Sequence, residues 1–210
     1  MQVEYRLKVP TLQQARTMLD EAAGMNPGPW VAHSQITARA ARLIAAELSE
    51  LDPEAAYILG CLHDIGRREG VHGMRHAIDG YQFLAAQGFE DAARICLTHS
   101  FPIPIAAAGS DWDGTPADFD FLQDYLDHLE YDIYDRLIQM CDSISQPTGY
   151  CLMEKRLVDV ALRYGFNPHT RAKWQAFIGI RQDFELKLGK SIYSLLPGIV
   201  ENTFESQSLP

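Results

Sequence analysis

Six histidine and aspartate residues, spread over separate apolar segments, constrain the fold of this chain more than any other feature. Leu62 and Ile65, for example, flank the adjacent pair formed by His63 and Asp64. Buried imidazole and carboxylate groups are costly unless they are paired with each other or bind a metal. The fold must therefore bring such groups together inside the protein. The six residues are His33, His63, Asp64, His76, His99 and Asp142.

Apolar residues recur at helical spacing along almost the whole chain, and no alternating strand pattern competes with this spacing. Ile36, Ala40 and Ile44, for example, share one helical face. Asp52 followed by Pro53 is typical of a helix start, because the aspartate caps free amide groups and the proline loses no hydrogen bond there. We therefore predict an all-α fold. The expected helices cover residues 12–23, 31–48, 53–66, 74–87, 89–99, 118–145 (as one or two helices), 150–164 and 169–188.

The domain organisation follows from the length of 210 residues and from the lack of any linker, repeat or low-complexity tract. We expect residues 1–210 to form a single-domain helical bundle with a sizeable core. The six polar residues lie within about residues 30–146. A bundle can bring groups from different helices together only in its core. The C-terminal helices, within residues 150–196, are expected to pack on this region or to form a lid over it.

The formal net charge of -10 limits the classes of partner. Nucleic acid binding requires clustered lysine and arginine, so we expect no nucleic-acid partner. Residues 1–6 lack the apolar core of a signal peptide, and no apolar run is long enough to cross a bilayer. We therefore expect a cytoplasmic protein with no membrane partner. A small-molecule phosphate substrate is compatible with this charge if metals and arginines gather in one cleft. The sequence is also compatible with a homodimer.

The cysteines form no Cys-x-x-Cys pair, which argues against a zinc ribbon or a thioredoxin motif. Several of them lie close in sequence to the candidate metal ligands. Thiolate ligation is one interpretation, but burial of a small residue near a packed centre is preferred, because no cysteine spacing is diagnostic. The four residues are Cys61, Cys96, Cys141 and Cys151.

Several short segments around these residues resemble the HD-domain superfamily of metal-dependent phosphohydrolases. The order His…His-Asp…Asp is the minimal mark of that superfamily, and the two additional histidines resemble its two-metal members. The resemblance implies an all-α bundle of the HD-domain type, in agreement with the periodicity. The matching segments are Val31-Ala32-His33-Ser34, Cys61-Leu62-His63-Asp64-Ile65-Gly66-Arg67, Arg75-His76-Ala77, Thr98-His99-Ser100 and Met140-Cys141-Asp142-Ser143.

The resemblance also implies a role for each of the six residues in binding two divalent metal ions. His33, His63, Asp64 and Asp142 would hold the first ion. Asp64 would bridge to a second ion, completed by His76 and His99. This donor set fits iron or manganese, with nickel, cobalt and zinc as alternatives, better than it fits magnesium. A metal can lower the pKa of bound water to about 7, so a hydroxide could attack phosphorus at neutral pH.

Arg67 is the first candidate for contacting a substrate, since the family often places a basic residue three positions after this aspartate. We assign it, with Asp64, to catalysis, and we assign Arg67 and Arg75 to substrate binding. The planar guanidinium matches phosphate oxygens. The alternative for both arginines is solvation or pairing with surface acids. The run Glu154-Lys155-Arg156 could likewise contact an anion or lie on a helix surface.

His72 competes with His76 for the metal site, because residues four apart can share a helix face. His76 is preferred since it begins an amphipathic helix, whereas His72 lies beside Gly70 and Gly73.

The leading functional hypothesis is hydrolysis of a phosphate ester or phosphoanhydride of a small nucleotide-like substrate by a metal-bound hydroxide. Two alternatives stay open. Some superfamily members with the same order of six ligands are di-iron oxygenases of small polar substrates, and a third possibility is a non-catalytic nucleotide-binding sensor.

Overall fold

The computed structural model describes residues 7–109 and 112–204. The first six residues, on which the expectation about a signal peptide depends, lie outside the described residues. The prediction of an all-α fold is confirmed, since helices dominate and the strands form one short hairpin. The helices are α1 Leu12–Met25, α2 Pro29–Ala45, α3 Pro53–Leu62, α4 Arg75–Ala85, α5 Glu90–Thr98, α6 Pro116–Asp127, α7 Ile133–Asp142, α8 Met153–Tyr164, α9 Thr170–Leu188 and α10 Ile199–Phe204.

Short elements connect these helices at several places. The 3-10 helices are η1 Ile65–Glu69, η2 Ala106–Ala108 and η3 Ile192–Leu195, and strand β1 Ser145–Gln146 pairs antiparallel with β2 Gly149–Tyr150. The hairpin and α10 were not expected from the sequence, because segments of a few residues carry too little periodic signal.

Helix caps mark the start of α3, which was expected, and the start of α7, which the periodicity left open. Asp52 accepts a hydrogen bond from the amide of Glu54 at 2.8 Å, so α3 begins at Pro53 as expected. Asp132 accepts bonds from the amides of Tyr134 and Asp135 and caps α7. The segment 118–145 is therefore divided into two helices, since a capping residue marks a helix start.

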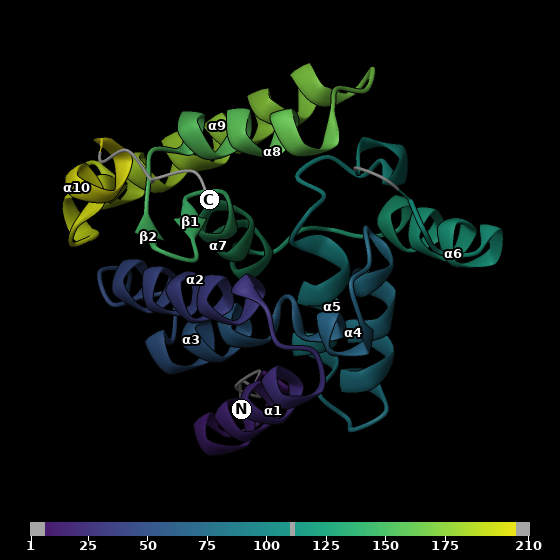
Figure 1. Ribbon diagram of the computed structural model, residues 1–210. Helices are drawn as coiled ribbons and strands as arrows, with labels where there is room; N and C mark the ends of the chain where they lie inside the picture. The colour runs from purple at the N-terminus through teal and green to yellow at the C-terminus, as the bar shows by residue number, and fades with distance from the viewer. Residues whose placement is uncertain (1–6, 110–111, 205–210) are drawn as a thin grey trace, which may run out of the picture.

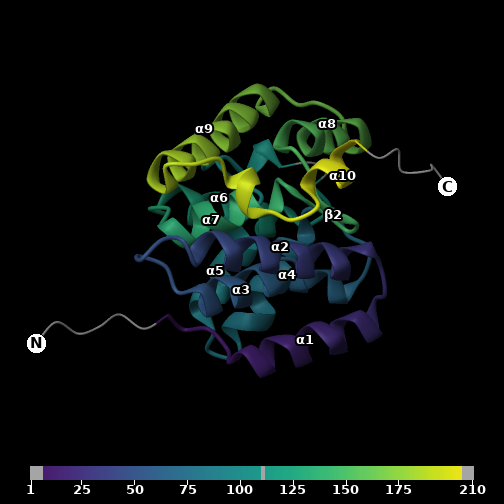
Figure 2. The same ribbon diagram turned by 90° about the vertical axis from the view of Figure 1, so that its left-hand side faces the viewer.

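The helices are arranged in layers, which Figures 1 and 2 show from two directions. Helix α1 lies at the bottom, α2 to α5 and α7 lie above it, and α8 and α9 form the upper layer. Helices α2 and α3 pack at very close range beside Gly60. A Cβ atom at Gly60 would lie 2.7 Å from the Cα of Ala38, so only glycine allows this approach.

One continuous apolar cluster joins the upper layer to the helices below it. Leu157 of α8 and Phe177 and Ile180 of α9 are buried in the same cluster as Leu59 of α3 and Ile138 of α7. The C-terminal helices therefore share a core with the region that carries the six polar residues. No helix among the described residues is long and apolar enough to span a membrane.

All four cysteines are buried and form no disulfide. Burial raises the pKa of the Cys61 thiol to about 12, so this group stays protonated. Neither of the metal-competent side-chain groups described below contains a cysteine.

Candidate metal centre

The six histidines and aspartates predicted from the sequence meet at one place in the interior. His33 lies on α2, the His63–Asp64 pair follows the end of α3, and Asp142 is the last residue of α7. The other two residues, His76 and His99, lie on α4 and directly after α5. The four histidines and Asp64 are each at most 5% exposed, and Asp142 is partly exposed. Side chains from five segments of the chain thus converge on a buried polar centre.

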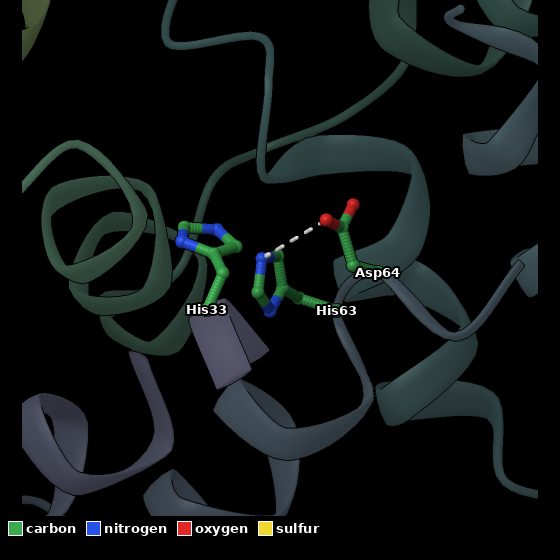
Figure 3. Close-up of side chains that lie close together, drawn as sticks. All are labelled: His33, His63 and Asp64. Atoms are coloured by element: carbon green, nitrogen blue, oxygen red, sulfur yellow. Dashed lines mark ion pairs between the residues drawn. The ribbon is translucent and has the colours of Figure 1, made fainter. Parts of the chain in front are cut away.

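The first half of this centre contains His33, His63 and Asp64, whose donor atoms lie within 4.8 Å of one another. Figure 3 shows the His33 ring beside His63 and the carboxylate of Asp64 on the far side of that ring. The Nε2 of His63 lies 3.9 Å from Oδ2 of Asp64. Asp142 completes this side, since its Oδ1 lies 2.9 Å from Nε2 of His33 and 4.0 Å from Nε2 of His63.

The second half contains Asp64, His76 and His99. Oδ1 of Asp64 lies 3.0 Å from Nε2 of His76 and 3.6 Å from Nε2 of His99. The two Nε2 atoms are themselves 3.3 Å apart. Asp64 therefore belongs to both halves, which is the position required of a bridging ligand.

Backbone carbonyls fix the tautomers of three of the histidines. The Nδ1–H of His63 donates to the carbonyl of Gly60 at 2.7 Å, and that of His76 donates to Gly73 at 2.5 Å. The Nδ1–H of His99 donates to the carbonyl of Cys96 at 3.0 Å. Because a carbonyl can only accept, each Nε2 carries a lone pair that points into the centre, as in metal-binding histidines.

This arrangement fits a metal ion better than it fits a protein-only hydrogen-bond network. Nε2 of His63 and Oδ1 of Asp64 are buried and have no hydrogen-bond partner. The lone pairs of His76 and His99 face each other and face Asp64, so a cation is needed between them. Two donors that are each about 2.1 Å from one ion lie about 3.0–3.4 Å apart at common coordination angles. The separations of 3.0 Å and 3.3 Å in the second half agree with this spacing.

The protonation states also suit metal binding, which requires neutral imidazole and ionised carboxylate. Burial lowers the pKa of His99 to about 3 and lowers the pKa of His33 as well. Burial alone would raise the pKa of Asp64, but the guanidinium of Arg67 and the neighbouring histidines hold it well below its usual range. Burial alone would also raise the pKa of Asp142. Its hydrogen bond with His33 outweighs this effect, so the pKa of Asp142 is lowered.

Arg67 lies at the centre, where it was expected. Its Nε donates to Oδ2 of Asp64 at 2.7 Å, and its Nη1 donates to the carbonyl of His72 at 3.3 Å. The packing of η1 against α4 makes this possible. A Cβ atom at Gly66 would lie 2.0 Å from the carbonyl oxygen of His76, so this contact requires glycine.

Arg75 lies elsewhere, although the sequence suggested it for substrate binding. Its Nε lies 3.4 Å from Oδ1 of Asp79, one helical turn away, and its side chain is not among those that line the cavity at the centre. His72 is also outside both metal-competent groups, and its Nδ1 lies 3.7 Å from Oδ2 of Asp113.

A cavity of about 170 Å³ is lined by all of the six residues except His63, and residues of α8 and α9 also line it. Sequence reasoning missed most of the wall that these two helices form. Arg156 lies in a run that suits a helix surface equally well, and Lys173 gave no signal, because only the docking of α9 turns this lysine inward. The wall includes Arg156, Leu157, Arg163, Tyr164, Lys173, Trp174 and Phe177.

Comparison with known proteins gives one family match. The family model described as the HD domain matches residues 30–146. No curated protein matches the sequence. Among solved structures, the HD domain of the phosphodiesterase PgpH from L. monocytogenes is similar, with 15% sequence identity and a TM-score of 0.45. That similarity covers 85% of this chain and 96% of the other.

Proposed function

Because the chain belongs to the HD-domain family, we propose that it is a metal-dependent phosphohydrolase acting on a small nucleotide-like substrate. The substrate bond is a phosphate ester or a phosphoanhydride. The observation that carries this proposal is the position of Asp64, which belongs to two groups of buried imidazoles. Its Oδ1 and the Nε2 of His63 are buried without a hydrogen-bond partner.

In this proposal the six residues hold two divalent ions, iron or manganese by preference. His33, His63, Asp64 and Asp142 would hold one ion, and Asp64, His76 and His99 would hold the other. Ions at these positions would supply a water of lowered pKa and positive charge for the phosphate oxygens.

The protein itself supplies the orientation of the side chains. The carbonyls of Gly60, Gly73 and Cys96 hold the Nδ1–H groups, so the imidazoles cannot rotate away from the centre. The bond from Arg67 orients the carboxylate of Asp64, and the guanidinium of Arg67 also lines the cavity. It can therefore contact a phosphate oxygen while it holds Asp64, which is the role of a catalytic and substrate-binding arginine.

The test compares the wild-type protein with Asp64→Asn on a panel of phosphate esters and nucleotides, each with manganese, iron or zinc. We expect hydrolysis in the wild type and a loss of about a hundredfold or more in the variant, together with loss of bound metal in elemental analysis. Asp124→Asn is the matched control, because Asp124 is 79% exposed on α6.

Three outcomes would count against the proposal. Full activity of Asp64→Asn, or full activity after complete metal removal, would refute the mechanism. Oxygen uptake that depends on reduced iron, with no zinc-supported hydrolysis, would identify the oxygenase alternative. Tight nucleotide binding with no turnover under any metal would identify a sensor.

A further inference from the structure

Cationic side chains gather around the cavity although the chain as a whole carries a formal net charge of -10. Arg67 approaches from η1, and three more cations approach from the upper layer, which Figure 1 shows above the metal-bearing helices. These three, which we call the wall cations, are Arg156 and Arg163 of α8 and Lys173 of α9. A concentration of positive charge in one cavity of an acidic protein indicates an anionic ligand.

Two of the wall cations share a single carboxylate. Nη1 of Arg156 lies 3.1 Å from Oδ2 of Asp159, and Nη2 of Arg163 lies 2.9 Å from the same oxygen. One negative charge therefore serves two guanidinium groups, and a net positive charge remains on this side of the cavity.

Lys173 is the least compensated of the wall cations. Its Nζ donates to the carbonyl of Ala108 at 3.3 Å, and within residues 7–109 and 112–204 it forms no salt bridge with a carboxylate. Lys173 is half-buried, and an accompanying anion stabilises an ammonium that is partly withdrawn from water. Burial lowers the pKa of Lys173 to about 8, with Asp142 opposing the effect, so the ammonium is still charged at neutral pH.

The carboxylates across the cavity cannot serve as that anion. Asp142 is engaged with His33, and Asp64 is engaged with Arg67 and the imidazoles of the second half. In the proposed function both carboxylates also bind metal. Among the carboxylates of the described residues none is left for Lys173, which favours an anion of the ligand as its partner. Lys173 lies on the wall that faces the metal-binding residues, so we assign this anion to a group distinct from the phosphate at the metals.

We propose that Lys173, assisted by Arg156, binds a second phosphate of the substrate, so that the preferred substrates carry at least two phosphate groups. This inference rests on the proposed function, because it places the first phosphate at the metal centre. It selects phosphoanhydrides and bisphosphorylated compounds over simple monoesters and diesters. Lys173 and Arg156 act as specificity-determining residues.

Binding of non-hydrolysable probes tests this inference without relying on turnover. Methylenediphosphonate carries two phosphonate groups and methylphosphonate carries one, and titration calorimetry with metal-loaded protein gives both affinities. For Lys173→Gln we expect affinity for methylenediphosphonate to fall about tenfold or more, since hydrogen bonds to charged groups are strong, and affinity for methylphosphonate to change less than about twofold. Lys173→Arg retains the charge and should restore most of the difference.

Lys190→Gln is the matched control, because Lys190 is exposed, does not line the cavity and pairs with Glu47 at 2.7 Å. It should bind both probes as the wild type does. Circular dichroism and thermal unfolding identify a variant that fails to fold, and Arg156→Gln then provides the same comparison at the neighbouring wall cation.

Equal weakening of both probes by Lys173→Gln, or no weakening of either, would overturn the inference. The result separates this inference from the proposed function. Lys173-dependent binding of methylenediphosphonate without hydrolysis of any phosphate would reject the phosphohydrolase and retain the second phosphate site. Efficient hydrolysis of monoesters, with diphosphate compounds bound no better, would reject the second phosphate site and retain the phosphohydrolase.

Discussion

The Nε of Arg67 lies 2.7 Å from Oδ2 of Asp64, and this bond leaves the other carboxylate oxygen, Oδ1, facing the imidazoles of His76 and His99. The two oxygens of Asp64 thus have different partners, since one accepts a hydrogen bond from the permanently charged Arg67 and the other faces two imidazole nitrogens that could bind a metal. Arg67 thus has two effects, since it orients the carboxylate and keeps it ionised.

Replacing Arg67 should therefore reduce activity through both effects. We expect Arg67→Ala to lower kcat/KM by about 10- to 100-fold and to weaken metal binding, because the largest influence that lowers the pKa of Asp64 is lost. Steady-state kinetics and metal titration measure the two effects. Arg171→Ala, at an exposed position of α9, is the control. Unchanged kinetics in Arg67→Ala would show that the arginine is only structural.

Metal stoichiometry should depend on which half of the centre is altered. His76→Ala removes a donor from the second half only, so we expect the protein to lose about half of its bound metal. Asp64→Asn should lose most of the metal, since Asp64 belongs to both halves. Elemental analysis of the purified variants measures this, with His128→Ala as an exposed control. Identical metal content in His76→Ala and the wild type would contradict a two-ion site.

Gly66 should be a sensitive position for stability and for the site. A methyl group there would lie 2.0 Å from the carbonyl oxygen of His76, so Gly66→Ala must displace η1 or α4. We expect a loss of about 1–3 kcal/mol in the free energy of unfolding, measured with urea. Gly179→Ala is the matched control, because nothing lies within 4 Å of its added Cβ on α9, and it should be neutral or stabilising. Equal stability of the two variants would contradict the close packing.

The metal-free protein should lose stability in mild acid. The pKa of His99 is lowered to about 3 in the fold, whereas an unfolded histidine has a pKa of about 6.5, so the unfolded state binds the proton first as the pH falls. The contribution of His99 to stability is therefore present in full above the unfolded pKa and decreases from about pH 6.5 toward pH 3. Urea unfolding across this range should show the decrease, and His99→Gln should reduce its slope. An unchanged slope in that variant would contradict this assignment.

The six polar residues of the centre could be identified from the sequence because each one interrupts an apolar helical segment, and the order of the six matched a known family. The wall cations could not be identified in the same way. Lys173 precedes Trp174 on a helix that mixes charged and apolar residues. Its environment depends on how α9 packs against α7. Periodicity gives the faces of a helix but not the partner that each face meets.

Arg75 shows the opposite difficulty. It adjoins His76 in sequence, and this proximity suggested a place at the substrate, yet neighbouring residues on a helix point in different directions. The guanidinium instead meets Asp79 one turn later, an ordinary pairing at four-residue spacing.

The upper layer has a consequence for how a ligand reaches the centre. Leu157, Phe177 and Ile180 are anchored in the shared apolar cluster, so swinging α8 and α9 away would expose hydrophobic surface to water. Arg163 and Tyr164 are exposed and line both the cavity and an adjoining pocket, so we expect a ligand to enter beside them. Entry there needs only rotation of exposed side chains, which occurs in picoseconds to nanoseconds. We therefore expect that ligand entry does not limit the turnover rate.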